Sequence, residues 1–170
     1  MKSRYNIALI PAKENDSVIK CAHFLSDVAD RYLLGENSLP HVTLYQFQAN
    51  DSDIESIWEK ACDKLSQTSI ELTFEKFSCI TFGQAIFWAS LLPDNGDVLM
   101  KMHSIIADVI NQPVKVNYDP HMTLISTKDA SYENLVNKLY KTYTPIQDVF
   151  ILALGRSDDI GQLTEVIYSC

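Results

Sequence analysis

The chain lacks an excess of basic residues, and this lack restricts the partners it can have. Its 170 residues include 14 Lys and Arg against 22 Asp and Glu, which gives a formal net charge of −8. A protein that tracks long nucleic acid usually carries a stripe of basic side chains to neutralise phosphates. The basic residues are scattered here, so we expect any nucleic-acid substrate to be short or to be held at a local site.

Paired cysteines and long apolar runs are also missing. The four cysteines lie far apart and form no Cys-x-x-Cys pair, so neither a zinc site nor a small disulfide framework is indicated. No apolar run approaches the length of a membrane span, and the first residues lack the apolar core of a signal peptide. We therefore expect a cytoplasmic protein with reduced thiols, monomeric and not attached to a membrane.

Glycine and proline are few, and no low-complexity segment separates one part of the chain from another. The 46% of apolar residues and 21% of charged residues are ordinary for a globular protein, and the length fits one domain or two small lobes sharing a core. Each half of the chain is expected to contain a strand, a helix, a strand, a helix and a strand. This order predicts a duplicated α+β unit rather than a doubly wound sheet, over a single bilobal domain at residues 1–170.

Apolar periodicity predicts the individual elements. Helices are expected over residues 17–34 and 97–110. A third helix is expected to begin at a capping box at Ser52, and a fourth at Ser131. Strands are expected over residues 6–10, 41–48, 69–77, 85–92, 121–127, 147–154 and 163–169. The last two strands are expected to be joined by a hairpin turn at residues 158–161.

Two short segments nearly repeat each other. Residues 40–44 are Pro-His-Val-Thr-Leu, and residues 120–124 are Pro-His-Met-Thr-Leu. Successive side chains of a strand point to opposite faces, so the His and Thr of each copy share one face while the apolar residues face a core. Two such pairs across one groove would supply a general base, a general acid and hydroxyl donors, a set that suits phosphoryl transfer without a metal.

A single His-x-Thr would indicate little, because an isolated strand histidine is usually a surface residue or a hydrogen-bonded one. The duplication favours catalysis over this alternative. Packing alone would fix the apolar positions of the two segments and would leave the histidine and threonine positions free to vary. Both are retained in both copies, each at an equivalent place in a repeated unit.

The pair of motifs, His41-x-Thr43 and His121-x-Thr123, resembles the signature of the two-histidine (2H) phosphoesterase superfamily, which includes 2′-5′ RNA ligase-like proteins and cyclic nucleotide phosphodiesterases. The resemblance extends to the order of elements over nearly the whole chain. It implies a bilobal α+β fold in which two antiparallel sheets face a central cleft. It also implies action on 2′,3′-cyclic phosphates or 2′-5′ phosphodiester bonds of nucleotides or short RNA.

The chemistry of such a site follows from the residue types. An unperturbed imidazole titrates near pH 6.5, so near neutrality one histidine can accept a proton while the other donates one. Thr43 and Thr123 can donate hydrogen bonds to phosphate oxygens as negative charge develops. No group of residues at metal-ligand spacing accompanies the motifs, so we expect neither a metal nor another cofactor. Which histidine is the base stays open, as do RNA 2′-5′ ligation and nucleotide binding without turnover.

Further substrate contacts are predicted at three positions. Strand alternation puts Tyr45 on the face of His41 and Thr43, where it could contact a phosphate or stack on a base. Ser126 occupies the position, five after the second histidine, where many relatives carry an arginine or an aromatic residue. Lys128 or Lys13 could then supply a cation.

Phe82 and Arg156 lie in turn-like segments that could reach the cleft. His23 and His103 fall in predicted helices without a companion hydroxyl, so we expect structural or surface roles for both.

Overall fold

The computed structural model describes residues 1–83 and 85–170. Its elements follow in the order β1 (Lys2–Pro11), α1 (Asn15–Phe24), β2 (Tyr32–Leu33), β3 (Val42–Asn50), η1 (Asp51–Asp53), α2 (Ile54–Lys64), β4 (Ser69–Phe82), β5 (Ile86–Pro93), α3 (Gly96–Val109), β6 (Met122–Thr127), α4 (Tyr132–Thr142), β7 (Ile146–Ser157) and β8 (Leu163–Ser169). The duplicated order that the sequence predicts is therefore present, with the short strand β2 added.

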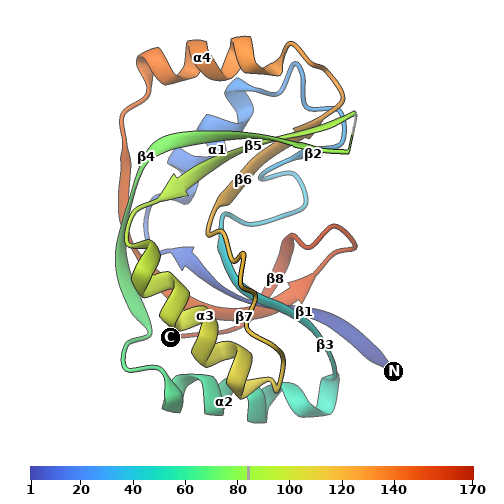
Figure 1. The fold of residues 1–170 in the computed structure, drawn as a ribbon, viewed down its shortest axis with the longest axis vertical. Helices are drawn as coiled ribbons and strands as arrows, with labels where there is room; N and C mark the ends of the chain where they lie inside the picture. The colour runs from blue at the N-terminus through green and yellow to red at the C-terminus, as the bar shows by residue number, and fades with distance from the viewer. Residues whose placement is uncertain (84) are drawn as a thin grey trace.

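All strands belong to one antiparallel sheet with the order β2-β6-β5-β4-β7-β1-β3, and β8 pairs with β7. Two long strands carry this sheet from one lobe to the other. The first part of β4 pairs with β7, while its second part pairs with β5, and Figure 1 shows β4 rising along one side of the molecule before it curves over. The predicted antiparallel α+β fold is confirmed, and its two expected sheets are continuous through β4 and β7.

The helices show that the two halves of the chain interlock. Helix α1, from the first half, packs against α4 and β6 of the second half. Helix α3, from the second half, packs against α2 and β3 of the first half. Figure 1 accordingly shows α1 and α4 at one end of the molecule and α2 and α3 toward the other. Each lobe thus needs two helices, one from each half of the chain, to cover its apolar sheet face.

The helix predicted over residues 17–34 is wrong in its second half. Helix α1 ends at Phe24, a series of turns follows, and Tyr32–Leu33 forms the edge strand β2 on β6. The spacing of Leu25, Ala29 and Tyr32 fits a helical face, yet Leu25 and Ala29 contribute to the core from irregular chain and Tyr32 contributes from the edge strand β2. Pairing with β6 gives the backbone of this segment hydrogen-bond partners and covers an open sheet edge, which outweighs a weak helical preference.

Other differences lie at element boundaries. The predicted capping box at Ser52 does not form, because the Ser52 hydroxyl donates to the Asp53 carboxylate, and α2 begins at Ile54 without a side-chain cap. Strands β4 and β7 extend beyond the ranges expected from alternation, because their far ends pair with β5 and with β8. The predicted hairpin turn between β7 and β8 is confirmed. The Asp158 carboxylate accepts hydrogen bonds from the backbone N–H groups of Ile160 and Gln162.

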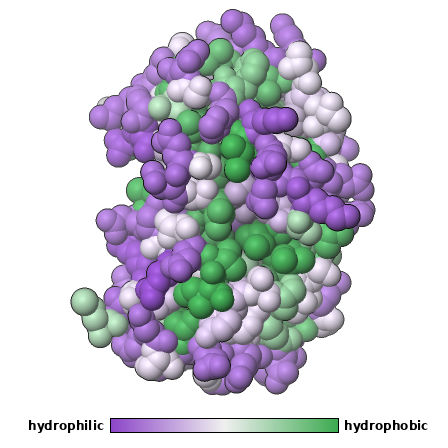
Figure 2. Space-filling model, turned by 180° about the vertical axis from the view of Figure 1, so that it is seen from behind, coloured by the Kyte–Doolittle hydropathy of each residue, from purple (hydrophilic) through white to green (hydrophobic). Residues whose placement is uncertain are grey.

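The surface is mainly hydrophilic at the two ends of the molecule, where α4 and α2 lie. Figure 2, which views the molecule from behind, shows hydrophobic residues gathered across the middle of that face between these ends. Within the part of the chain that the structure describes, no helix is long and apolar enough to cross a membrane. The apolar faces of the helices are instead used against the sheet.

Candidate active site

Both motif strands carry the same irregularity. In the β1–β3 pair, Thr43 lies opposite Ala8 and Tyr45 opposite Ile7, so Leu44 is left without a partner. In the β5–β6 pair, the residue after Thr123 is likewise left out of the register. A bulge of this kind bends a strand and redirects the side chains that follow it. Its occurrence at the same place in both motifs extends the duplication from sequence to backbone geometry.

The four motif residues are brought together at one cleft between the lobes. His41 and Thr43 come from β3 and the chain just before it, and His121 and Thr123 from β6 and the chain just before it. All four line a cavity of about 340 Å³. Figure 1 shows β6 in the upper lobe and β3 in the lower lobe, which explains how residues so distant in sequence meet.

Each motif histidine is held in the same tautomer by the same local contact. The Nδ1 atom of His41 lies 2.7 Å from the carbonyl oxygen of Leu39, and Nδ1 of His121 lies 2.7 Å from the carbonyl oxygen of Asp119. A carbonyl oxygen can only accept, so Nδ1 carries the hydrogen in both rings. In each ring this leaves Nε2 as the atom available for proton exchange in the cleft.

The two histidines differ in burial. His41 is only 5% exposed, whereas His121 is half-buried. Burial lowers the pKa of His41 to about 4; the charge of His121 adds to this, while the hydrogen bond to Leu39 and the charge of Asp158 oppose it. His41 is therefore neutral at neutral pH, and its Nε2 can accept a proton.

A buried amide orients the first threonine. The Nδ2 group of Asn6 donates to Thr43 Oγ1 over 2.9 Å, and Asn6 is fully buried in β1. Because this contact uses a lone pair of the hydroxyl, the hydroxyl hydrogen stays available to be donated toward the cleft. Thr123 has Ser90 opposite it on β5, and Ser90 also lines the cleft. Sequence reasoning did not identify Asn6, whose only signal is a polar residue inside an apolar strand.

A stack of three rings supports the β3 bulge from behind. His103 is fully buried between Tyr118 and Tyr45, with ring centroids at 4.2 Å and 5.1 Å and nearly parallel planes. Its Nε2 accepts from the backbone N–H of Lys115, and the Tyr118 hydroxyl donates to the carbonyl oxygen of Thr43. The stack thus ties the first motif to the segment that leads into the second. The expectation of a structural role for His103 is confirmed.

The prediction for Tyr45 is corrected by the bulge at Leu44. The extra residue reverses the alternation, so Gln46 instead of Tyr45 shares the cleft with Thr43. The Tyr45 side chain is buried on the other side, where its hydroxyl donates to the carbonyl oxygen of Pro113. The sequence shows no signal for such a bulge, which depends on pairing with β1.

The other predicted contacts divide between the cleft and its surroundings. Ser126 lines a second cavity beside the cleft. Lys128 is exposed beyond the end of β6, where its backbone N–H donates to the Asp30 carboxylate, and neither it nor Lys13 is among the described residues that line the cleft. A different lysine, Lys115, lines the cleft with its Nζ 4.8 Å from the centre of the Tyr45 ring.

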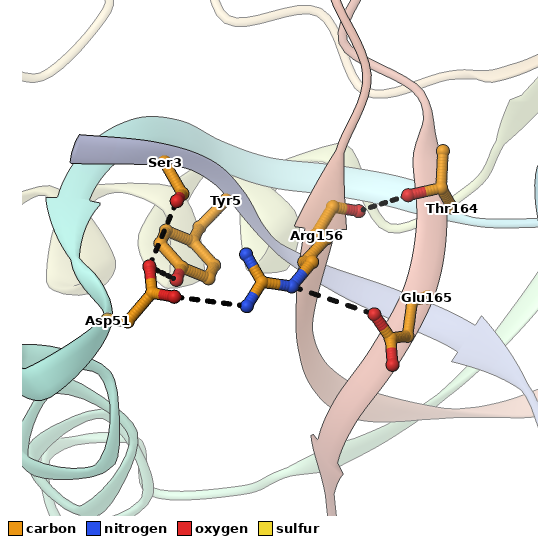
Figure 3. Close-up of polar contacts among 6 residues, drawn as sticks. All are labelled: Ser3, Tyr5, Asp51, Arg156, Thr164 and Glu165. Carbon is orange, nitrogen blue, oxygen red and sulfur yellow. Dashed lines mark hydrogen bonds and ion pairs between the residues drawn. The ribbon is translucent and has the colours of Figure 1, made fainter. Parts of the chain in front are cut away.

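Phe82 lines the cleft as expected, but Arg156 does not. Figure 3 shows its guanidinium between the Asp51 and Glu165 carboxylates, at 3.2 Å and 3.6 Å, with the Tyr5 and Ser3 hydroxyls also donating to Asp51. These ion pairs are largely exposed, so they contribute little to stability. Arg156 is therefore engaged on the surface of the β1–β7–β8 region.

The turn between β7 and β8 forms another wall of the cleft. Gly161, in this turn, has a φ of +88°, and its carbonyl oxygen accepts from Gln46 Nε2 over 2.5 Å. A Cβ at this position would collide with the Gln46 amide, so glycine permits this close approach.

Within residues 1–83 and 85–170, no three His, Cys, Asp or Glu side chains gather in a way that could hold a metal ion.

Comparison with known proteins places this arrangement in a family. A model of the 2′-5′ RNA ligase superfamily matches residues 29–159, which include both motifs. The chain belongs to this superfamily. It is accordingly an enzyme of the 2H phosphoesterase type. None of the curated proteins compared with it by sequence matches.

Solved structures share the fold over nearly their whole length. A crystal structure of a phosphoesterase has a TM-score of 0.63 and 13% identity, with 100% of this chain and 98% of that chain covered. LigT of Escherichia coli, complexed with 3′-AMP, has a TM-score of 0.62 and 14% identity, with 100% and 98% covered. TT0787 of Thermus thermophilus has a TM-score of 0.57 and 11% identity, with 98% and 96% covered.

Proposed function

We propose that this enzyme is a metal-independent phosphodiesterase that acts on 2′,3′-cyclic phosphates or 2′-5′ phosphodiester bonds of nucleotides or short RNA. His41 and His121 transfer the protons, and Thr43 and Thr123 donate hydrogen bonds to the phosphate. The protein works as a monomeric single domain in the cytoplasm. The observation that carries the proposal is the position of both His-x-Thr pairs around one cleft. In each imidazole the Nδ1 hydrogen is donated to a backbone carbonyl oxygen, so Nε2 is available for proton transfer.

The proposed substrate class draws support from the fold relatives. LigT of E. coli has been crystallised with phosphate, with 3′-AMP and with ATP. A cleft that contains two imidazoles, two threonine hydroxyls and Lys115 is suited to a phosphate group, since these side chains offer hydrogen-bond donors and positive charge. The net charge of −8 favours a small substrate held at this local site over a long nucleic acid.

Ring opening of a 2′,3′-cyclic phosphate needs two proton transfers. In the proposed mechanism, the neutral Nε2 of His41 accepts a proton from water as the water oxygen attacks phosphorus. The Nε2–H of His121 is donated to the ribose oxygen as its bond to phosphorus breaks, which gives a phosphomonoester and a free hydroxyl. The threonine hydroxyls stabilise the charge that develops on the non-bridging oxygens. Exchange with solvent then restores both protonation states.

Burial supports the assignment of His41 as base in this direction. A buried imidazole is more easily kept neutral, whereas water near the half-buried His121 can stabilise an imidazolium. In RNA 2′-5′ ligation a 5′-hydroxyl replaces water as the nucleophile and the two roles stay the same, whereas they exchange in the reverse reaction, in which the neighbouring ribose hydroxyl attacks a 2′-5′ bond, the 5′-oxygen leaves and the cyclic phosphate forms. The match to the 2′-5′ RNA ligase superfamily keeps ligation as the second candidate function.

A turnover assay tests the proposal. Purified protein is incubated with 2′,3′-cyclic AMP, with a 2′-5′-linked diadenylate and with its 3′-5′-linked isomer, in the presence and absence of EDTA. Hydrolysis of either of the first two, unchanged by EDTA, is the expected result. Activity that EDTA abolishes and Mg²⁺ or Mn²⁺ restores would contradict metal independence. Binding without turnover of any compound would indicate a nucleotide-binding module.

A further inference from the structure

Two of the four cysteines lie in contact, although 108 residues separate them in the sequence. The Sγ atoms of Cys62, on α2, and Cys170, directly after β8, are 3.6 Å apart. A disulfide bond needs a separation of about 2 Å, so the sulfurs would have to approach by only about 1.6 Å, which side-chain rotation can supply. The other two cysteines are placed differently, since Cys21 is buried in α1 and Cys79 is exposed on β4.

The backbone of Leu152, in β7, brings the two cysteines together. Its N–H donates to the carbonyl oxygen of Thr68 over 2.7 Å, and its carbonyl oxygen accepts from the N–H of Cys170 over 3.1 Å. Thr68 lies in the short segment between α2 and β4. One residue of β7 therefore fixes both the chain that leaves α2 and the end of β8, and Figure 1 shows the C-terminal end above the last turn of α2.

A stacked aromatic pair holds the same two elements one helical turn away. The rings of Trp58 and Tyr168 have centroids 5.9 Å apart and planes inclined by 14°. Trp58 precedes Cys62 by four residues and so shares its face of α2, while Tyr168 precedes Cys170 by two residues and shares its side of the extended chain. The aromatic contact and the thiol contact are thus neighbours, and the first keeps the second in place.

Strand β8 gains support from this junction. Among the described residues its strand pairing is with β7, and the register of that pair shifts at two places. The turn that joins the two strands forms a wall of the catalytic cleft, whereas Cys170 lies at the opposite, open end of the hairpin. A covalent bond at the open end would limit fraying of β8, because it would fix that end to a helix.

We propose that Cys62 and Cys170 form a reversible disulfide bond that ties α2 to the open end of the β7–β8 hairpin. The two thiols stay reduced under reducing conditions and pair when a disulfide oxidant is present. Neither cysteine is among the described residues that line the catalytic cleft, so the bond leaves the chemistry of that site intact. The inference goes beyond the proposed function and does not depend on it.

Glutathione disulfide can serve as the oxidant, through two steps of thiol–disulfide exchange. The thiolate of Cys170 attacks one sulfur of glutathione disulfide and releases one glutathione thiolate. The thiolate of Cys62 then attacks Sγ of Cys170, forms the protein disulfide and releases the second glutathione thiolate. The two cysteines lose two electrons and two protons, and these convert glutathione disulfide into two molecules of glutathione.

The surroundings of the two thiols favour this order of attack. Cys170 is exposed and so meets the oxidant first. Partial burial raises the pKa of Cys62 to about 11, and the neighbouring Cys170 and the charge of Asp63 add to this rise. Cys62 is therefore the slower thiol toward an external oxidant, but its position beside Cys170 makes the second, internal step favourable.

The length of the closed loop sets the size of the expected effect. A disulfide restricts the unfolded chain, and the stabilisation grows with the number of residues between the two cysteines. For the 108 residues between these positions, we expect oxidation to raise the Tm by about 5–15 °C relative to the reduced protein.

Peptide mapping tests the pairing. The protein is equilibrated with glutathione disulfide, free thiols are alkylated, and trypsin is added without a reductant. Lys and Arg residues separate all four cysteines, so each lies in a tryptic peptide of its own, at residues 21–31, 61–64, 77–101 and 157–170. We expect peptide 61–64 to be joined to peptide 157–170, and dithiothreitol to release them. Linkage of other pairs, or glutathione retained on Cys170 beside an alkylated Cys62, would overturn the proposal.

Thermal unfolding of the same samples measures the stabilisation. Wild type and Cys79→Ser, the same type of change at an exposed cysteine outside the pair, should both have a higher Tm after oxidation than in dithiothreitol. Cys62→Ser and Cys170→Ser should each have one Tm under both conditions, and either variant suffices if the other folds poorly. Equal Tm values for oxidised and reduced wild type would overturn the stabilising role. Neither measurement uses turnover, so their outcome is independent of the test of the proposed function.

Discussion

His103 donates its Nδ1 hydrogen to the carbonyl oxygen of Leu44, over 2.7 Å, and so holds the bulge that follows Thr43 and directs Gln46 into the cleft. The acceptor at Nε2 is satisfied by the Lys115 N–H, which fixes the tautomer. A histidine with no catalytic contact therefore links the strand of the first motif to the segment that precedes the second. The geometry of the cleft depends on this linkage as well as on the four motif side chains.

His103→Ala is accordingly expected to destabilise the protein. The change leaves a cavity between two tyrosine rings and removes the partners of two backbone groups, the carbonyl of Leu44 and the N–H of Lys115, which together cost about 3 kcal/mol. The free energy of unfolding in urea measures this loss. His23→Ala, at an exposed position of α1, is the matched control and should change it by no more than about 0.5 kcal/mol. Equal values for the two variants would show that the ring stack does not support the site.

Asn6 provides a test of hydroxyl orientation. Asn6→Asp replaces the donor to Thr43 Oγ1 by an acceptor, which would draw the hydroxyl hydrogen away from the cleft. Thr43→Val removes the hydroxyl and should lower kcat by about a hundredfold, as expected for loss of one donor to a developing oxyanion. We expect Asn6→Asp to lower kcat to a comparable extent in a protein with native circular dichroism. A wild-type kcat for Asn6→Asp would mean that this amide does not orient Thr43.

The buried His41 makes stability depend on pH in a defined direction. Its pKa is about 4 in the folded protein and 6.5 in the unfolded chain, so between these values the unfolded state binds more protons. Its contribution, roughly 3 kcal/mol, is present above pH 6.5 and is lost as the pH falls through 4. Urea unfolding at a series of pH values should therefore show a shallower decline in this window for His41→Gln. Parallel curves for the two proteins would contradict the burial argument.

The lowered pKa of His41 also affects the pH dependence of catalysis. If neutral His41 is the base, kcat/KM for 2′,3′-cyclic AMP should follow a bell-shaped pH profile whose acidic limb lies below 6.5. The limbs are macroscopic values of the histidine pair and are not assigned to single residues. Initial rates at low substrate concentration between pH 4 and 9 give this profile. An acidic limb at or above pH 6.5 would favour the reverse assignment of base and acid.

The duplicated motif made the fold class and the four motif positions predictable, because strand alternation and repetition are visible in the sequence. The bulges after Thr43 and Thr123 were not, since they exist only through pairing with β1 and β5. Simple alternation therefore gave the wrong face for Tyr45. A similar limit explains residues 25–34, where apolar spacing fits a helix while the edge of β6 selects a strand.

Residues that position the catalytic side chains without lining the cleft were the hardest to identify from the sequence. The sequence predicts a helix around His103 and leaves its role as structural or surface, because its ring partners Tyr45 and Tyr118 are far away in sequence. The walls of the two cavities come from segments as separate as Tyr32, Trp88 and Ile160. Such sets become visible only when the strand order is known.

The central claim is that two histidines share the proton transfers, and kcat/KM of the single and double variants on a 2′,3′-cyclic nucleotide tests it most directly. His41→Ala and His121→Ala are each expected to lose about 10²-fold or more, because each removes one proton transfer. The double variant should lose much less than the product of the two factors, since the groups act as a unit. Near wild-type turnover by either single variant in a folded protein would contradict the two-histidine mechanism.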